Sequence, residues 1–293
     1  MMISHMTRSL KLSLLAALAL MAVSCGTTTT LPSGAKVKFP VNDQQGRVAI
    51  VAHRGFWNCD AGGHSENSIA ALKAAQDNGF FGSECDLQLT ADGVVIVNHN
   101  NEIDGLVIRD HNWDELKSHL LPNGERRPTL DEYLDQTEKC KTTKLVIEFK
   151  KQKESAKEDE LVDKTIAAMK AHGLYSPKRI AFISFSKHIC EKLAAEHPAF
   201  VNQFLTSDKK KSQEPTQYAE KFINGIDYQY NLFFMHPEWI KTAHKMGMSV
   251  NAWTVDVKED IIATITLGVD QVTTNEPLLV RSLIGYGEYK LGR

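Results

Sequence analysis

The sequence has few cysteines and almost no net charge, and both absences narrow its possible functions. It contains five cysteines in 293 residues, and no Cys/His cluster that suggests a zinc site. The formal net charge is −2 at pH 7, so there is no excess of positive charge to bind a polyanion such as nucleic acid. The hydrophobic content of 42% is enough for a large core. The composition therefore indicates one large folded domain without a nucleic-acid partner.

The N-terminus carries a signal for export. Basic residues precede an apolar run at residues 12–23, which has the length of a signal-peptide core and is too short to span a bilayer as a mature helix. Small residues then lead to Cys25, as in a bacterial lipoprotein processing site. Leucine is commoner where Ala22 stands, so ordinary signal cleavage stays open. We expect a signal peptide at residues 1–24 and a lipid anchor at Cys25, which would hold the protein on a membrane of the bacterial cell envelope.

Residues 25–43 are rich in Thr, Gly, Ser and Pro, a composition that predicts a flexible tether. The folded domain then occupies residues 44–293. The sequence leaves open the disulfide status of its four cysteines, because an even count in an oxidising envelope is weak evidence; they are Cys59, Cys85, Cys140 and Cys190. Cys85 lies in a strand pattern and is better explained as a buried free thiol.

Eight short apolar runs rich in β-branched residues are spaced through this domain. They begin near Val48 and Gly82 and continue at residues 144–149, 180–185, 201–205, 225–228, 248–254 and 269–273. Helical patterns separate most of them, at residues 160–172, 186–196, 237–245 and 258–267. Eight strands with interleaved helices in roughly 250 residues predict an α/β fold, the (β/α)8 TIM barrel.

The first strand pattern ends in the motif AHRG at residues 52–55. His53 and Arg54 thus follow a strand at its carboxyl end, where α/β proteins bind ligands. Arg54 offers a planar fork of donors that suits a phosphate, and Gly55 allows close approach of the backbone. A His-Arg pair satisfied by nearby backbone groups is about equally compatible with this motif.

A helix is predicted after this motif. Ser65 or Asn67 can cap its start, Gly79 marks its end, and apolar residues recur with helical spacing at Ile69, Leu72 and Ala75. Glu66 is then most simply a first-turn residue that the helix dipole favours.

Glu84 and Asp86 lie two apart on the next strand, so they project to one face with Cys85 on the other. Two neighbouring carboxylates repel each other unless a cation compensates them. Oxygen ligands suit Mg²⁺ or Ca²⁺, so this pair predicts a divalent metal site. The alternative is ordinary polar surface.

The dipeptide Asp92-Gly93 predicts a hairpin turn, after which residues 94–97 return antiparallel to the preceding strand. Counting back through the turn places His99 level with Glu84 and Asp86. We therefore expect an extra hairpin strand after the second barrel strand, and a second histidine beside the carboxylates.

Glu148 and Lys150 share one face at the end of the third barrel strand. Without further information Lys150 would open a solvated run of Lys and Glu at residues 150–160. Trp253 ends another strand, where it is about as compatible with a core or barrel-mouth residue as with a ligand contact.

Four motifs, in this order and spacing, resemble the catalytic half of the glycerophosphodiester phosphodiesterase family: AHRG, SENSIAA, ECDLQLTADG and VVIVNH. The resemblance implies hydrolysis of a glycerophosphodiester to glycerol 3-phosphate and an alcohol. It implies metal ligation by Glu84, Asp86 and Glu148, and phosphate binding by Lys150. It also implies that Trp253 and the pair Glu66-Asn67 lie near the substrate.

The expected mechanism uses a divalent cation, Mg²⁺ or Ca²⁺, to neutralise phosphate charge while Arg54 and Lys150 hold oxygens. His53 serves as base and His99 as acid. By resemblance to phospholipase-C-like barrels, the attacking group can be the glycerol hydroxyl of the substrate itself. The family commonly has Asp where this chain has Asn100 and Asn where it has Asp256, and neither change removes an expected catalytic group.

Two other functions remain compatible with the sequence. A related barrel enzyme acting on lysophospholipids or phosphoinositides would use the same residues. A non-catalytic envelope binding module would tolerate missing site residues, yet all of them are present here. The sequence does not identify the alcohol, the metal or the oligomeric state, and the short chain between His99 and Glu148 allows only a small insertion for substrate recognition.

Overall fold

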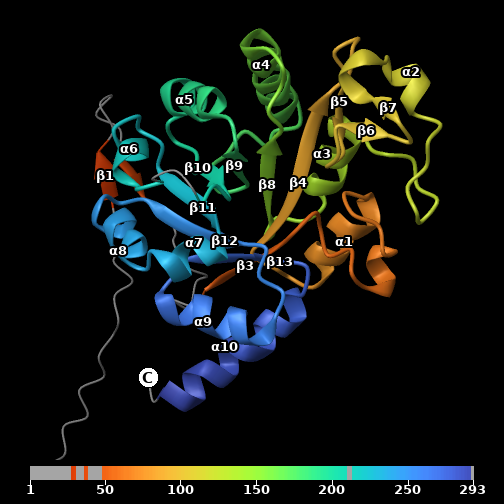
Figure 1. Ribbon diagram of the computed structural model, residues 1–293. Helices are drawn as coiled ribbons and strands as arrows, with labels where there is room; N and C mark the ends of the chain where they lie inside the picture. Colours follow the sequence, from red (N-terminus) through yellow and green to blue (C-terminus); the bar gives the residue numbers. More distant parts are fainter. Residues whose placement is uncertain (1–27, 31–35, 39–47, 210–212, 292–293) are drawn as a thin grey trace, which may run out of the picture.

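The computed structural model describes residues 28–30, 36–38, 48–209 and 213–291. Eight parallel strands close into a barrel surrounded by helices (Figure 1). The strands are β3 (Ala49–Ala52), β4 (Gly82–Leu89), β8 (Lys144–Phe149), β9 (Ile180–Ser184), β10 (Asn202–Thr206), β11 (Gly225–Gln229), β12 (Ser249–Trp253) and β13 (Gln271–Thr274). Pairing of β13 with β3 and of β3 with β4 closes the ring. The predicted (β/α)8 barrel is confirmed, with strand boundaries shifted by up to two residues.

The extra hairpin strand is also confirmed. Strand β5 (Val95–Val97) pairs antiparallel with the end of β4, with Leu87 opposite Val97 and Leu89 opposite Val95. β4 pairs with β3 only through its first two residues, so β5 occupies the edge that β3 leaves free. The backbone N–H of Gly93 closes the turn on the carbonyl of Thr90, at a φ of +78° that glycine adopts easily.

Helices cover the outside of the barrel (Figure 1). Those that connect barrel strands are α1 (Ile69–Asp77), α3 (Leu130–Glu138), α4 (Ser155–Ala171), α5 (Lys187–Glu196), α6 (Thr216–Ala219), α7 (Tyr230–Met235), α8 (Glu238–Lys245) and α9 (Lys258–Leu267), and α10 (Pro277–Leu291) follows the last strand. No sequence pattern had predicted α3, α6, α7 or α10. The predicted helix at 258–267 is reproduced.

Two predicted helix starts are wrong. Ser68, not Ser65 or Asn67, caps α1, because its hydroxyl accepts the Ala71 N–H while Asn67 adopts a left-handed φ of +57°. Helix α4 begins at Ser155 and not at residue 160. The reason is Glu158, which is buried and accepts hydrogen bonds from Gln152 and Ser186. Part of the charged run at 150–160 therefore packs against the barrel.

Alternation along the strands separates two surfaces. Cys85, Leu87 and Ile147 face outward into the core beneath the helices. Val51 and Val146 face the barrel interior, together with Ala181, Ile183 and Leu205. Glu84, Asp86 and Glu148 share the inward face of their strands, so the barrel directs them toward one another.

Residues 98–129 form a small unit beyond the hairpin (Figure 1). It consists of β6 (Glu102–Ile103), β7 (Leu106–Val107), the 3-10 helix η2 (Ile108–Asp110) and α2 (Trp113–Leu116). Outside this unit, the 3-10 helix η1 (Asp60–Gly62) precedes α1. Three residues of the unit, Ile103, Ile108 and Leu116, form an apolar cluster with Ile96 of β5. This agrees with the small insertion that the sequence allows.

The signal peptide at 1–24 and Cys25 lie outside the described residues. Within the tether predicted at 25–43, strands β1 (Thr28–Thr30) and β2 (Lys36–Lys38) pair antiparallel. Across the described ranges, no helix is both long and apolar enough to cross a membrane. The thiols of Cys59, Cys85, Cys140 and Cys190 are all free, and Cys85 is buried as expected.

Candidate active site

The loop after β3 is tightly constrained. Arg54 has a left-handed φ of +55° and Gly55 one of +81°, an uncommon pair that turns the chain sharply. A Cβ atom on Gly55 would lie 2.7 Å from that of Ala71, so α1 packs directly against this loop. The backbone N–H of Arg54 donates to Glu84 Oε2 at 2.7 Å. The loop is thereby fixed to the neighbouring strand β4.

Glu84, Asp86 and Glu148 form what we call the barrel cluster. All three side chains are buried, and one oxygen of each lies within 4.8 Å of the others. Asp86 and Glu148 stand opposite each other in the parallel pairing of β4 with β8. Glu84 Oε1 is buried and has no hydrogen-bond partner among the described residues. A buried oxygen of this kind is costly unless a cation or a donor meets it.

The charges within the barrel cluster oppose one another. Burial, together with Asp86 and Glu148, raises the pKa of Glu84 well above its usual range. Burial and Asp86 likewise raise the pKa of Glu148. Burial acts against ionisation of Asp86 too, but Lys150 and His99 outweigh it and lower the pKa of that carboxyl. Three ionised carboxylates therefore need more positive charge than the protein supplies.

Two basic side chains border the barrel cluster. Lys150 Nζ lies 2.9 Å from Asp86 Oδ1 and 2.8 Å from Glu148 Oε1, and its side chain is only 12% exposed. The alternative that Lys150 is a solvated surface residue is therefore wrong. Arg54 Nε lies 3.8 Å from Asp86 Oδ2, and Arg54 NH1 lies 2.6 Å from Glu66 Oε2. Glu66 thus precedes the helix and holds Arg54, which differs from the expected first-turn position.

Asn67 fixes the position of Asp86 from the same loop. Its side-chain N–H donates to Asp86 Oδ2 at 2.7 Å, and its side-chain oxygen accepts the Asp86 N–H at 3.2 Å. Asn tolerates a left-handed φ better than most residues, which explains its place at this turn. The sequence placed Asn67 near the site by resemblance, and the structure shows what it contacts.

His99 reaches the barrel cluster from the hairpin. The N–H of Asn98 donates to the Asp86 carbonyl at 2.9 Å, so His99 follows directly after the residue that pairs with Asp86. Burial lowers the pKa of His99, while the charge of Asp86 opposes that shift. His99 Nδ1 lies 2.9 Å from Asn100 Oδ1. The side chain of Asn100 therefore contacts the histidine at the position where the family commonly has Asp.

His53 is held at the end of the barrel by residues from the opposite end of the sequence. Its Nδ1 lies 2.9 Å from Asn275 Oδ1, and its backbone N–H donates to the Thr274 carbonyl at 3.0 Å. Burial, followed by the charge of Arg54, lowers the pKa of His53 to about 4. His53 is therefore neutral near pH 7, as a base must be before it takes a proton.

Trp253 ends β12, which is separated from β3 by β13 alone. Its indole N–H donates to the Asp227 carbonyl at 2.9 Å, and its ring meets Phe185 edge to face at 5.6 Å between centroids. Phe185 follows β9 and is 39% exposed. The two rings form an aromatic wall beside the polar site, and the sequence had indicated only Trp253.

Comparison with known proteins gives the family. The model of the glycerophosphoryl diester phosphodiesterase family matches residues 53–279. The chain belongs to this family. A glycerophosphodiester phosphodiesterase of Caldanaerobacter subterraneus subsp. tengcongensis is 27% identical over 82% of this chain and 99% of its own length. One of Bacillus subtilis is 26% identical over 79% of this chain and 84% of its own.

Solved structures agree. A glycerophosphodiester phosphodiesterase from Parabacteroides distasonis superposes with a TM-score of 0.78 at 33% identity, covering 82% of this chain and 98% of that one. A phosphodiesterase of Oleispira antarctica, solved with its product sn-glycerol-3-phosphate, gives 0.69 at 21% identity over 81% and 96% of the two chains, a likeness of fold. The family membership expected from the four motifs is confirmed.

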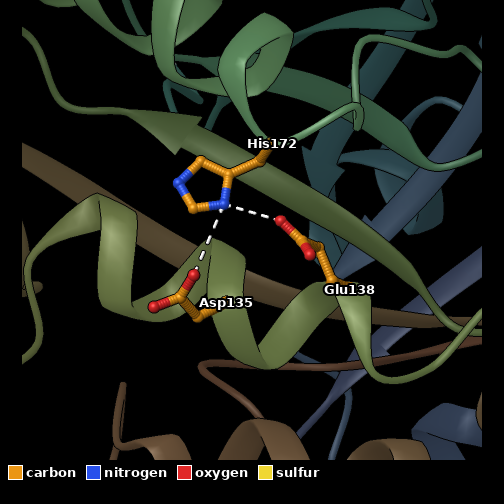
Figure 2. Close-up of side chains that lie close together, drawn as sticks. All are labelled: Asp135, Glu138 and His172. Atoms are coloured by element: carbon orange, nitrogen blue, oxygen red, sulfur yellow. Dashed lines mark hydrogen bonds and ion pairs between the residues drawn. The ribbon is translucent and has the colours of Figure 1, made fainter.

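A second group of potential ligands lies away from the barrel mouth. Figure 2 shows Asp135 and Glu138 on α3 facing His172 at the end of α4, and we call these three the surface cluster. His172 Nδ1 lies 2.7 Å from Glu138 Oε1 and 3.5 Å from Asp135 Oδ1. Both carboxylates are exposed. The surface cluster is accounted for as ion pairing that joins two neighbouring helices.

Proposed function

We propose that this family member hydrolyses glycerophosphodiesters with a divalent cation at the barrel cluster and with His53 and His99 as base and acid. Membership of the family establishes a phosphoric diester hydrolase. The observation that supports the finer proposal is the meeting of three buried carboxylates with Lys150 and Arg54 at the carboxyl ends of β3, β4 and β8. The product bound by the Oleispira relative supports glycerol 3-phosphate as the product here.

The donor set fits a hard cation, Mg²⁺ or Ca²⁺. Glu84, Asp86 and Glu148 would hold it, because all three supply oxygen and Glu84 Oε1 lies buried without a partner in the described structure. When bound, such a cation neutralises phosphate charge and makes the phosphorus more electrophilic. Arg54 and Lys150 would hold phosphate oxygens, since both present donors at this mouth. Trp253 would lie beside the substrate.

The two histidines divide the proton transfers. His53 takes the proton of the attacking hydroxyl as its oxygen bonds to phosphorus. The bond from phosphorus to the alcohol breaks, and His99 gives its proton to the departing oxygen. The attacker is water, or the glycerol hydroxyl of the substrate, in which case water opens the resulting cyclic phosphate. Both routes end in glycerol 3-phosphate and a free alcohol.

The direct test assays the purified full chain on glycerophosphocholine, glycerophosphoethanolamine and glycerophosphoinositol, with glycerol 3-phosphate as the readout. We expect release from at least one diester. Absence of release from all three, with Mg²⁺ and Ca²⁺ each supplied, would refute the proposal.

A related barrel enzyme acting on lysophospholipids is the principal alternative. The exposed ring of Phe185 beside Trp253 offers apolar surface near the site, which an acyl chain could contact. Micellar lysophosphatidylcholine, compared with glycerophosphocholine at equal headgroup concentration, separates the two. Higher kcat/KM on the soluble diester supports our proposal, and higher kcat/KM on the lysolipid supports the alternative.

We also propose that the enzyme is exported and lipid-anchored through Cys25 in the bacterial cell envelope. The support is the apolar run at 12–23 followed by small residues and Cys25. Acyl chains would then hold the protein at the membrane, where phosphodiesters arise from phospholipids. We expect wild-type protein in the membrane fraction and Cys25→Ser in the soluble fraction, with equal turnover of a small diester. Soluble wild-type protein would contradict the anchor.

A further inference from the structure

His53 is the start of a line of hydrogen bonds that leads away from the barrel cluster. Its Nδ1 lies 2.9 Å from Asn275 Oδ1, and Asn275 Nδ2 donates to Asp256 Oδ2 at 2.8 Å. Asn275 follows β13 directly, and β13 pairs with β3, the strand after which His53 comes. The established family reaction needs a correctly placed base, and this line reaches the proposed one.

The side-chain amide of Asn275 has only one consistent orientation. The indole N–H of Trp57 donates to Asn275 Oδ1 at 3.1 Å, and an indole nitrogen cannot accept. At the other end a carboxylate oxygen of Asp256 can only accept, so it requires the Asn275 NH₂ group. Both contacts assign the oxygen to the side that faces His53. Asn275 therefore presents an acceptor, and His53 Nδ1 must carry the proton.

Asp256 is itself fixed. Its Oδ1 accepts the Thr274 hydroxyl at 2.9 Å and the Asn275 backbone N–H at 2.8 Å. The carboxylate is thus bound by three donors from Thr274, the last residue of β13, and Asn275, which follows it. It cannot rotate to release Asn275 without losing two of them. Because Asp256 is held in this way, it fixes the orientation of the Asn275 side chain. Asn275 in turn fixes the orientation of His53.

We infer that Asp256 and Asn275 are positioning residues that hold His53 in the tautomer with its proton on Nδ1 and its lone pair on Nε2. A base needs that lone pair on the nitrogen that faces the attacking hydroxyl. Asp256 does not touch His53, and no proton passes to it. The inference rests on the proposed role of His53 as base, but the tautomer is a separate property of the fold.

The exchange of the two side chains tests the inference. Asp256→Asn puts an NH₂ group against the Asn275 NH₂ group, so the Asn275 amide should turn over and present its own NH₂ group to His53. The double variant Asp256→Asn/Asn275→Asp restores a donor facing an acceptor and again gives His53 an oxygen. We expect Asp256→Asn to lower kcat by about 10- to 100-fold with little change in KM, as for groups that orient a reacting residue. The double variant should regain most of that loss.

Histidine tautomers can be read without any substrate. In protein labelled with ¹⁵N at histidine, long-range ¹H–¹⁵N spectra distinguish a proton on Nδ1 from one on Nε2, and His53→Gln assigns the signal. We expect Nδ1–H in the wild type and the double variant, and a shift toward Nε2–H in Asp256→Asn. A wild type with the proton on Nε2, or an unchanged tautomer in Asp256→Asn, would overturn the inference even if the protein hydrolyses diesters.

Two further variants complete the experiment. Trp57→Phe removes the other contact to Asn275 Oδ1 while keeping an aromatic ring, and Asp256 still requires the Asn275 NH₂ group, so the proton should stay on Nδ1. A shift toward Nε2–H in Trp57→Phe would show that Trp57, and not Asp256, sets the orientation. The wild-type spectrum tests the inference even if Asp256→Asn fails to fold. Asn58→Ala is the matched control, because Asn58 donates to Glu276 at 2.5 Å between the same two loops and has no hydrogen bond to His53 or Asn275 in the described structure. It should leave both kcat and tautomer unchanged. An equal loss in Asn58→Ala would show a general loosening of the loops and contradict specific positioning.

Discussion

The barrel cluster and the surface cluster contain similar residue types but differ in burial and in how their charges are compensated. Each brings three potential ligand atoms within 4.8 Å of one another. In the surface cluster His172 pairs with both carboxylates, which water also reaches. In the barrel cluster all three carboxylates are buried, and one oxygen of Glu84 has no partner among the described residues. Burial with unmet charge at a barrel mouth, and not proximity, distinguishes a candidate catalytic centre.

The largest difference in turnover should be between variants of the catalytic histidines and the variant of His172. We expect His53→Ala and His99→Ala each to lower turnover by about two to four orders of magnitude, the usual contribution of general acid–base catalysis. His172→Ala, in the surface cluster, should leave turnover unchanged. A large loss in the His172 variant would mean that the comparison between the clusters is wrong.

A good leaving group separates the two histidine roles. p-Nitrophenolate needs little protonation as it leaves phosphorus. A substrate in which p-nitrophenol is the alcohol of the diester should therefore restore turnover in His99→Ala and not in His53→Ala. The measurement is the ratio of variant to wild-type kcat on this ester and on glycerophosphocholine. Rescue of His53→Ala instead would reverse the assignment of base and acid.

Carboxylate variants should give the next largest contrast. Glu84→Gln and Asp86→Asn should lower kcat by about 100- to 1000-fold, since they weaken electrostatic support of the transition state. Asp135→Asn and Glu138→Gln change the same groups in the surface cluster and should retain full activity. Equal losses in the two sets would remove the distinction drawn from burial.

The pH dependence of stability offers a smaller effect. The fold lowers the pKa of His53 from 6.5 to about 4, so the folded protein binds fewer protons than the unfolded chain between these values. This contribution to the free energy of unfolding is therefore fully present above pH 6.5 and is lost as pH falls toward 4. The loss reaches about 3 kcal/mol at most. We expect His53→Gln to abolish this part of the dependence, measured by urea unfolding of both proteins at pH 7 and pH 4.5. If the free energy of unfolding changed equally in both proteins between pH 7 and pH 4.5, this expectation would be wrong.

His172 should show the smallest effect, with the opposite sign. Burial opposes its charge, but hydrogen bonds with Glu138 and Asp131 raise its pKa above 6.5. Its contribution to stability is thus present below pH 6.5 and is lost as pH rises through the folded pKa. Because the carboxylates are exposed, we expect His172→Gln to cost less than about 1 kcal/mol at pH 5.5 and less still at pH 8.5. Unfolding measurements at those two pH values check the direction.

The sequence predicted the barrel and much of the candidate site because both depend on local periodicity. Alternation along β4 placed Glu84 and Asp86 on one face, and the hairpin turn brought His99 level with them. The end of β3 then supplied His53, and the resemblance to the family selected Glu148 near the end of β8. No relation between distant residues was needed for these steps.

What the sequence missed depends on contacts between distant segments. Asn275 lies 222 residues from His53 along the chain, and no local pattern joins them. The buried Glu158 in the first turn of α4 accepts the hydroxyl of Ser186, the N-cap residue of α5, and no local pattern shows this contact. Asp256 was noticed as a departure from the family pattern, yet its partners Thr274 and Asn275 were visible only in the fold.

The central claim is that the barrel cluster binds a divalent cation that hydrolysis requires. The direct measurement titrates chelator-treated protein with Mg²⁺ and with Ca²⁺, following heat of binding by calorimetry and glycerol 3-phosphate release in parallel. We expect the treated wild type to be inactive, to bind one ion, and to recover activity in proportion to occupancy, while Glu84→Gln binds weakly. Full activity after chelation, or unchanged binding in Glu84→Gln with loss in Glu138→Gln, would contradict the account.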